Sequence, residues 1–296
     1  MNSGNGRGPT LTEDFLAVLV LYGQTLHGSA TFRSLGAELR RSSSRLELLV
    51  YDNSPTALGR PGTADAREWA REWEIHYVHD PSNPGVSRAY VEGAKLAVQR
   101  SKRWLLFLDQ DTTFPPDALI RYVAAIHAYP EIRLFAPILR SAGRIVSPCV
   151  YAFKVGSPLR RLRPGPRRLT ALSVLNSGMC VAVDDYLAVG GHDVRIGLDF
   201  SDHEFVHRFK RSHARAVVLD VECHHGLSTT SSPERPSQLS RFGSYCRGAK
   251  YASTGLLDTI ITAGIIGTRA ALLSLRHGDL SFVRIAGAVL LEGKAR

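Results

Sequence analysis

Four apolar segments of β-strand character recur at a nearly constant interval in the first half of this 296-residue chain. They begin at Phe15, Leu46, Ile75 and Trp104, which are 31, 29 and 29 residues apart. That interval is the length of a βαβ unit. Helical patterns lie between the segments, the clearest of them at residues 86–98, behind an Asn-Pro-Gly turn. Apolar strands alternating with helices predict one doubly wound α/β domain with a mostly parallel, Rossmann-like sheet.

Polar residues follow all four predicted strands. Ligands of open α/β sheets bind beyond the carboxyl ends of the strands, so these residues are candidates for a binding site. Each group alone also fits an ordinary turn, because Asp, Asn, Ser and Gly are turn formers. Their coincidence at one edge favours a site. The groups are Tyr22-Gly23, Asp52-Asn53-Ser54, Asp80 with Asn83 and Gly85, and Asp109-Gln110-Asp111.

Two common nucleotide-binding motifs are missing from the sequence. No G-x-G-x-x-G follows the first strand, and no G-x-x-x-x-G-K-[ST] occurs anywhere, which argues against a dinucleotide oxidoreductase and a P-loop nucleotidase. The pair Asp109 and Asp111, at the end of a buried strand, instead offers hard oxygen ligands to one divalent cation. Mg²⁺ or Mn²⁺ suits such ligands, with substrate phosphate and water completing the shell.

Five segments together resemble the family 2 inverting glycosyltransferases of GT-A fold, and most closely the bacterial rhamnosyltransferases that build O-antigen and related polysaccharides. The resemblance runs in order from about Leu16 to about Arg247. It implies a GT-A sheet and metal-dependent transfer from a nucleotide sugar. The segments are YDNSPTA at 51–57, NPGVSRAYVEGAK at 83–95, WLLFLDQDT at 104–112, NSGMCVAV at 176–183 and GLDFSDHEFVHRFK at 197–210.

The resemblance assigns the donor site to the predicted strand ends. By position, Asp52 looks like the acid that reads the pyrimidine base, and Tyr22 lies where the first loop meets that base. Asn83 and Gly85 resemble the turn that lets the chain pass close to the nucleotide. Asp109 matches the first acid of the family's D-x-D, nearer the ribose.

The resemblance also implies a set of metal and phosphate ligands. Asp111 looks like the direct metal ligand, with Asp109 beside it. His225 fits the spacing of the histidine that completes the metal shell, although the adjacent His224 leaves the register open by one residue. Arg247 resembles an arginine that braces the diphosphate, since guanidinium groups match phosphate oxygens well.

Inverting transfer needs a base on the acceptor side of the sugar. The D-x-E at 202–204 matches the family's acidic pair, with Asp202 as general base and Glu204 as a supporting or acceptor-binding carboxylate. Ser177 and Gly178 resemble the turn beside the acceptor. A structural alternative exists, because Ser201-x-x-Glu204 also reads as a helix capping box.

The net charge of +10 is unevenly distributed. Residues 132–183 hold nine basic and no acidic side chains, and residues 235–296 hold nine basic against three acidic ones. The apolar stretch 256–275 is long enough to span a membrane, but Asp258 and Arg269 leave only ten uncharged residues between them. We expect a packed or interfacial helix there, with docking on an anionic membrane surface as one role.

We therefore expect a glycosyltransferase domain at 1–235, with a nucleotide-binding half at 12–131 and an acceptor-binding half at 132–235, followed by a helical region at 236–296. The expected reaction transfers L-rhamnose from dTDP-rhamnose to a saccharide or lipid-linked saccharide, in the cytoplasm or peripherally at the inner membrane face. A UDP-sugar enzyme such as a galactofuranosyltransferase and a non-catalytic nucleotide-sugar-binding protein remain alternatives. Nucleic-acid binding has no recognised motif to support it.

Overall fold

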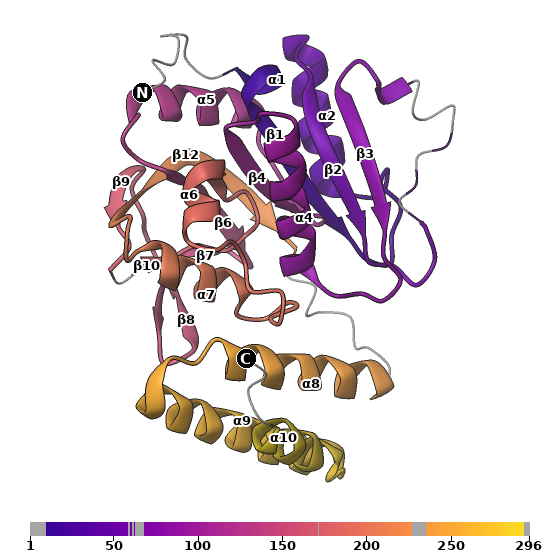
Figure 1. Ribbon diagram of the computed structural model, residues 1–296, viewed down its shortest axis with the longest axis vertical. Coiled ribbons are helices and arrows are strands. Elements are labelled where there is room, and N and C mark those ends of the chain that lie inside the picture. Colours follow the sequence, from indigo (N-terminus) through magenta and orange to yellow (C-terminus); the bar gives the residue numbers. More distant parts are fainter. Residues whose placement is uncertain are drawn as a thin grey trace.

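The computed structural model describes residues 10–58, 60, 62, 68–170, 172–226 and 235–292. A mixed twelve-stranded sheet forms its centre, with the order β10-β7-β6-β11-β4-β1-β2-β3 along the main path. Figure 1 shows helices on both faces of this sheet and a separate layer of three helices below it.

The four strands expected from the periodicity are present and parallel. They pair in the order β3-β2-β1-β4, so the predicted parallel half of the sheet is confirmed. Every residue of β1 and β2 is buried. The sequence of β1 is apolar throughout, as burial on both faces favours, whereas β2 also buries Glu47 and Asp52. The strands are β1 (Phe15–Leu21), β2 (Leu46–Asp52), β3 (Trp73–His79) and β4 (Trp104–Asp109).

Alternate residues of β1 enter two different hydrophobic cores. Phe15 and Leu19 pack on the side of helices α2 and α5, whereas Leu16 and Val18 pack on the side of α4. Because successive strand side chains point to opposite faces, this division shows that both faces of the sheet are covered. The helices here are α1 (Leu11–Asp14), α2 (Ala30–Ser42), α4 (Val86–Gln99) and α5 (Ala118–Ala128).

The second half of the chain extends the same sheet with mixed direction. β11 runs antiparallel to both β4 and β6, and β12 is parallel to β6. β12 continues to His225 and pairs there with β5. The elements are β5 (Thr112–Thr113), β6 (Leu134–Ser141), β7 (Arg144–Ala152), β8 (Val155–Leu159), β9 (Gly165–Arg168), β10 (Leu172–Ser173), β11 (Cys180–Ala182), α6 (Val183–Ala188), α7 (Ser201–Phe209) and β12 (Arg215–His225).

The N-terminus of α4 joins the two halves of the chain. Gly85 has φ +92°, and a Cβ there would lie 2.0 Å from the carbonyl oxygen of Gly197. The N–H of Val86 donates to the same oxygen at 2.7 Å, and the hydroxyl of Ser87 donates to the carbonyl of Ile196. Only glycine combines this φ with so close a backbone approach.

Three helices form the C-terminal layer: α8 (Arg235–Tyr251), α9 (Gly255–His277) and α10 (Ser281–Leu291). They share a hydrophobic core that also takes in Ile196 and Phe200 from the segment before α7. α9 is long and apolar enough to cross a membrane by length and composition, and only 17% of its apolar window is buried. One face of α9 is therefore packed, with Ile266 and Ala270 in the core, while most of the helix faces outward; an interfacial role stays a prediction.

Candidate active site

The loops after β1, β2 and β4 are held together by hydrogen bonds. The N–H of Tyr22 donates to Oε1 of Gln110 at 2.8 Å, and Nε2 of Gln110 donates back to the Tyr22 carbonyl at 3.2 Å. The N–H of Gly23 donates to Oγ of Ser54 at 2.9 Å. The polar strand ends thus meet at one edge of the sheet, and the Tyr22 side chain stands exposed there.

Asp52 ends β2 without any exposed surface. Its Oδ1 accepts from the N–H of Ser54 at 3.0 Å, and its Oδ2 accepts from the hydroxyl of Tyr77 at 2.7 Å. Sequence reasoning expected this carboxylate to contact a nucleotide base directly. In the described structure it instead holds the loop after β2 and the ring of Tyr77.

Asn83 and Gly85 lie at the expected turn before α4, with different surroundings. Asn83 is exposed with φ 48°, and its N–H donates to the carbonyl of Asp80 at 3.1 Å. Gly85 faces the backbone of Gly197. Close packing between the two halves of the chain accounts for this glycine, which the resemblance assigned to nucleotide approach.

The D-x-D carboxylates point to different neighbours. Oδ1 of Asp109 accepts from the buried hydroxyl of Tyr90 at 3.3 Å, and Oδ1 of Asp111 lies 3.5 Å from Nδ1 of His225. Burial raises the pKa of Asp109, with the carboxylates of Asp111 and Asp202 adding to the shift and His225 opposing it. Burial also raises the pKa of Asp111. The site therefore concentrates negative charge that a bound cation would stabilise.

His225, rather than His224, faces Asp111. The antiparallel pairing of β5 with β12 sets His225 opposite Thr112, whose Oγ1 lies 2.7 Å from Nδ1 of His225. The same hydroxyl lies 2.6 Å from Oγ of Ser177. These hydrogen bonds hold the His225 ring beside Asp111. His224, on the other face of the strand, is exposed.

Ser177 and Gly178 were expected beside the acceptor, and the structure buries both. Ser177 supports the Thr112–His225 pair. Gly178 has φ +78°, and its N–H donates to the carbonyl of Phe107 at 2.7 Å. A Cβ on Gly178 would lie 2.6 Å from Pro137. In this structure both residues position the segment that carries the D-x-D.

The donor atoms of Asp111 and His225 suit Mn²⁺ or Mg²⁺, since a carboxylate oxygen and an imidazole nitrogen leave positions for phosphate oxygens and water. Among the described residues, a second cluster of acids and a histidine has ligand atoms that lie close together: Glu47, Glu74 and His76. It lies toward the starts of β2 and β3, away from the strand ends that carry the D-x-D. Arg100 donates to Glu47 at 2.6 Å, and Nζ of Lys102 lies 3.0 Å from it. These cations neutralise that group, which is an ion-pair network.

Asp202 lies in the first turn of α7, and its side chain is 15% exposed. Within the described residues its ion-pair contact is with His203 alone, at 3.9 Å. It lies close enough to raise the pKa of Asp109 across the site. Asp202 is thus a carboxylate that faces the D-x-D without a Lys or Arg partner among the residues described.

Glu204 lies on the opposite side of the same helix. Arg208 binds both of its oxygens, at 2.5 and 2.7 Å, and also donates to the carbonyls of Val189 and Gly191. The expected acceptor-binding role is therefore not the one this geometry supports, because Glu204 anchors α7 to the preceding turn. The expected capping box is also wrong, since the N-cap is Phe200 and no side chain caps the helix.

Arg247 was expected to brace a diphosphate, but its side chain is exposed on α8. Two other arginines, Arg241 and Arg269, lie near Asp199. Burial raises the pKa of Asp199, and these two guanidinium groups oppose the shift. Sequence reasoning missed Arg269 because it lies inside the apolar stretch of α9. It is far along the chain from every acidic motif, so nothing in the sequence indicated that it lies near Asp199.

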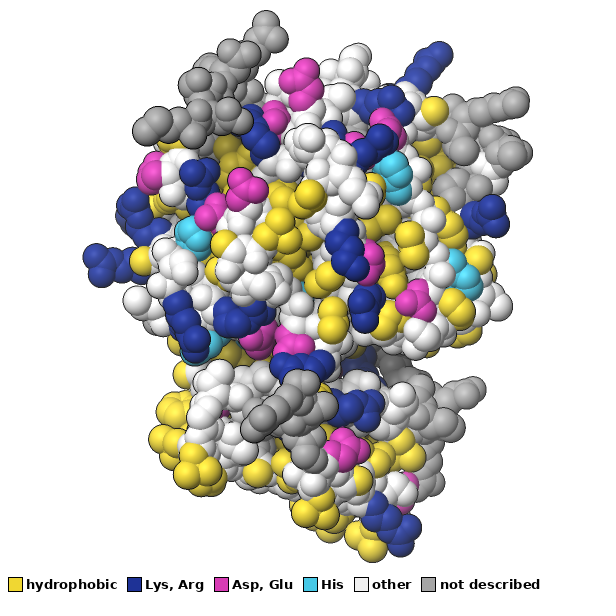
Figure 2. Space-filling view, viewed as in Figure 1, with side chains coloured by type: hydrophobic (Ala, Val, Ile, Leu, Met, Phe, Trp, Pro, Cys, Tyr) yellow, Lys and Arg dark blue, Asp and Glu magenta, His cyan; other side chains and the backbone are white. Residues whose placement is uncertain are grey.

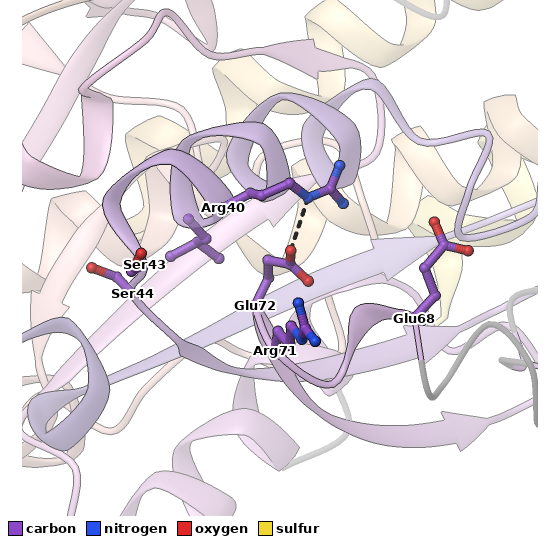
Figure 3. A pocket seen from close by; sticks show the side chains of 7 residues that line it. Arg40, Ser43, Ser44, Glu68, Arg71 and Glu72 are labelled. Carbon is purple, nitrogen blue, oxygen red and sulfur yellow. Dashed lines mark hydrogen bonds and ion pairs between the residues drawn. The ribbon is translucent and has the colours of Figure 1, made fainter.

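A pocket among the described residues lies away from this site. Figure 3 shows it between the end of α2 and the start of β3, where Arg40 pairs with Glu72 at 2.8 Å. It measures about 550 Å³, and Glu68 and Arg71 also line it. Its position, before β2 and β3 begin, is at the opposite edge of the sheet from Asp109 and Asp111.

Comparisons with known proteins agree with this architecture. Residues 30–143 match the family model "Glycosyl transferase family 2". No curated protein sequence matches the chain. S. aureus TarS, residues 1–349, superposes with a TM-score of 0.51 at 13% identity, covering 86% of this chain and 69% of that one.

GalNAc-T7, solved with UDP, GalNAc and Mn²⁺, superposes with a TM-score of 0.55 at 10% identity, covering 93% of this chain and 56% of that one. The same TarS fragment has been solved with UDP-GlcNAc, with a TM-score of 0.50 at 10% identity, covering 86% of this chain and 71% of that one. The chain thus has the GT-A fold, as its sequence predicted, with a C-terminal helical extension.

Proposed function

We propose that this chain is a metal-dependent inverting glycosyltransferase that transfers L-rhamnose from dTDP-rhamnose to a saccharide or lipid-linked saccharide. The reaction would serve bacterial cell-surface polysaccharide synthesis, on the cytoplasmic side of the membrane. The observation that carries the proposal is the pairing of an acidic cation site at Asp111 and His225 with a separate carboxylate, Asp202, that lacks a Lys or Arg partner among the described residues. Inverting transfer requires this division between a leaving-group side and a base side.

Asp202 would act as the general base. The acceptor hydroxyl attacks the anomeric carbon while the bond from that carbon to the diphosphate breaks, and the hydroxyl proton moves to Asp202. The neighbouring acids Asp193 and Glu204 are held by Arg195 and Arg208, so they are unsuited to the role. Tyr151 and Cys149 lie beside Asp202 as neutral groups, because burial raises both pKa values and Asp202 adds to each shift.

Asp111 and His225 would hold the divalent cation, which would neutralise charge on the departing diphosphate. Thr112 and Ser177 keep the imidazole oriented toward that position. Asp109, which accepts a hydrogen bond from Tyr90, would contact the ribose, as the resemblance implies. The resemblance still favours Tyr22, Asp52 and Asn83 at the base, and contact with Asp52 would require movement of the Tyr77 side chain.

Two kinds of similarity support the donor class. The ordered set of motifs resembles bacterial rhamnosyltransferases, and fold relatives have been solved with UDP, UDP-GlcNAc or UDP with Mn²⁺. We also propose the division expected from the sequence, with a glycosyltransferase unit at 1–235 and a helical region at 236–296. We assign thymine as the nucleobase of the donor because of the resemblance to rhamnosyltransferases.

The test is a donor panel with the full chain. dTDP-rhamnose and UDP-sugars are each supplied with Mn²⁺, Mg²⁺ or a chelator, and release of nucleoside diphosphate and product is measured. Metal-dependent release from dTDP-rhamnose supports the proposal. Release of nucleoside diphosphate from a UDP-sugar alone would mean that the donor is a UDP-sugar and not dTDP-rhamnose. Release from no donor, with nucleotide binding intact, would mean that the chain is a binding protein and not an enzyme.

A further inference from the structure

The outward face of α9 is uncharged and strongly exposed. Leu256 is 79% exposed, Leu257 72%, Leu272 62% and Leu275 81%, with Ile260 at 60%. The buried residues of this helix, such as Ile266 and Ala270, follow each other at a spacing of four on the opposite face. A soluble surface rarely exposes so many large apolar side chains on one helix.

The two charges that interrupt the apolar stretch are turned away from this face. Asp258 accepts from Nζ of Lys154 at 3.1 Å and from the N–H of Thr254 at 2.8 Å. The guanidinium of Arg269 lies 3.9 Å above the ring of Tyr245 on α8. The charges therefore attach α9 to the rest of the molecule and leave the outward face free of them.

Neighbouring elements extend the apolar surface. Leu280, Val283 and Leu291 are 66%, 45% and 88% exposed on and beside α10. Phe153, 72% exposed, lies next to Lys154 at the tip of the β7–β8 hairpin, which reaches the start of α9 through the Lys154–Asp258 pair. Figure 2 shows hydrophobic side chains along the lower edge of the molecule, over α9 and α10.

Basic side chains border this surface. Arg276 and Arg284 are exposed at the end of α9 and on α10. Apolar side chains flanked by arginines are the features by which interfacial helices bind anionic lipid, with the apolar face among the acyl chains and the arginines at the headgroups.

We propose that α9, α10 and the β7–β8 hairpin dock in the plane of an anionic bilayer surface. The geometry favours lying on the membrane over spanning it. A spanning α9 would carry Asp258 and Arg269 into the hydrocarbon and would expose its packed residues, including Ile266, to lipid instead of α8 and α10. Lying flat keeps these contacts and buries the exposed leucines.

The test measures sedimentation of the full chain with vesicles of phosphatidylcholine alone and with phosphatidylglycerol added. We expect binding to the anionic vesicles and at least ~10-fold weaker binding for the double variant Leu257→Glu with Leu275→Glu, because each leucine loses its apolar burial. Arg276→Gln with Arg284→Gln should weaken binding about 10-fold or more on the anionic vesicles only.

Ile120→Glu provides the matched control. Ile120 is 49% exposed on α5, which lies at the other end of the molecule from α9 (Figure 1), so this variant should bind vesicles like the parent chain. Unchanged thermal melting of all variants shows that they fold. The assay needs no donor, so its failure is separate from failure of the proposed reaction.

Three results would overturn the proposal. The first is that the chain binds neither kind of vesicle. The second is that the Ile120→Glu control loses as much vesicle binding as the Leu257→Glu, Leu275→Glu variant. The third is resistance to alkaline carbonate extraction from membranes, which would mean a spanning helix. A dimer that dissociates in the Leu257→Glu, Leu275→Glu variant without any vesicle binding would assign this face to a second copy of the chain.

Discussion

Nδ1 of His225 lies 3.5 Å from Oδ1 of Asp111, although the two residues come from opposite halves of the chain. The short pairing of β5 with β12 produces this approach, because it sets His225 opposite Thr112, the residue after Asp111. Two strand residues in β5 therefore fix the geometry of the candidate cation site.

Thr112→Val should raise the Mn²⁺ concentration needed for nucleotide-dependent activity by about 10–100-fold, because the hydroxyl that orients His225 is lost. Titration of activity and of thermal stabilisation with Mn²⁺ measures this change. Thr113→Val is the control, since Thr113 is exposed on the same short strand. Equal effects of the two variants would contradict a positioning role for Thr112.

Asp202→Asn should lower the rate of sugar transfer by about 10²–10⁴-fold, because the amide cannot accept the acceptor proton. Donor and Mn²⁺ binding, followed by thermal shift, should remain at the parent level. If Asp202→Asn retains sugar transfer while Asp111→Ala loses it, another group is the general base and the assignment of the cation site is unaffected.

Glu204→Gln should destabilise the fold by about 1–3 kcal/mol, because Arg208 loses a charged partner in a largely buried pair. Urea unfolding at neutral pH measures the free energy. Glu222→Gln is a control with a more exposed pair, Glu222 with Arg140, and should change stability by less than about 1 kcal/mol. A raised KM for the acceptor with unchanged stability would restore the acceptor-binding role of Glu204.

Gly85→Ala should cost about 1–3 kcal/mol more than Gly143→Ala. Both glycines have positive φ, so both variants carry backbone strain, but a Cβ at Gly143 meets nothing within 4 Å while one at Gly85 meets the Gly197 carbonyl. The difference between the two free energies of unfolding isolates the contact. Equal losses would mean that the backbone relaxes away from Gly197.

His192 should make the fold sensitive to acid. Burial holds its pKa at about 3, below the ordinary value of 6.5, while its Nε2 contacts Oδ1 of Asn176 at 3.0 Å. Its contribution to stability is therefore present above pH 6.5 and is lost as the pH falls toward 3, by up to about 1.4 kcal/mol per unit. His192→Phe should flatten this slope in urea unfolding series, and an unchanged slope would refute the assignment.

The parallel half of the sheet was predictable because local signals agree there. The segments starting at Phe15, Leu46 and Trp104 are mainly apolar, although Glu47 interrupts the second, and polar turn formers follow each of the last two. The mixed half was less predictable, since β12 continues through Glu222 and His224, polar residues that alternate with buried ones. Its pairing partners, β5, β6 and β9, are distant in sequence.

Motif positions identified the neighbourhood of the candidate site better than they identified contacts. Asp111 and His225 meet as the motifs suggested, but the partner of Asp52, Tyr77, follows from tertiary packing. The partner of Glu204, Arg208, is a local i,i+4 neighbour on α7. Burial decides whether a polar residue faces a ligand or the interior, and sequence spacing on a strand or turn does not report it. Ser177 and Gly178 illustrate the same limit.

The contact between Gly85 and Gly197 has a consequence for how catalysis would be organised. It ties the segment before α4 to the segment before α7 through a backbone hydrogen bond and an approach too close for a side chain. In the proposed reaction, substrates would meet a frame whose separation is set when the chain folds. Less conformational entropy is then lost in each turnover, and we expect the two halves to unfold together in a single cooperative transition.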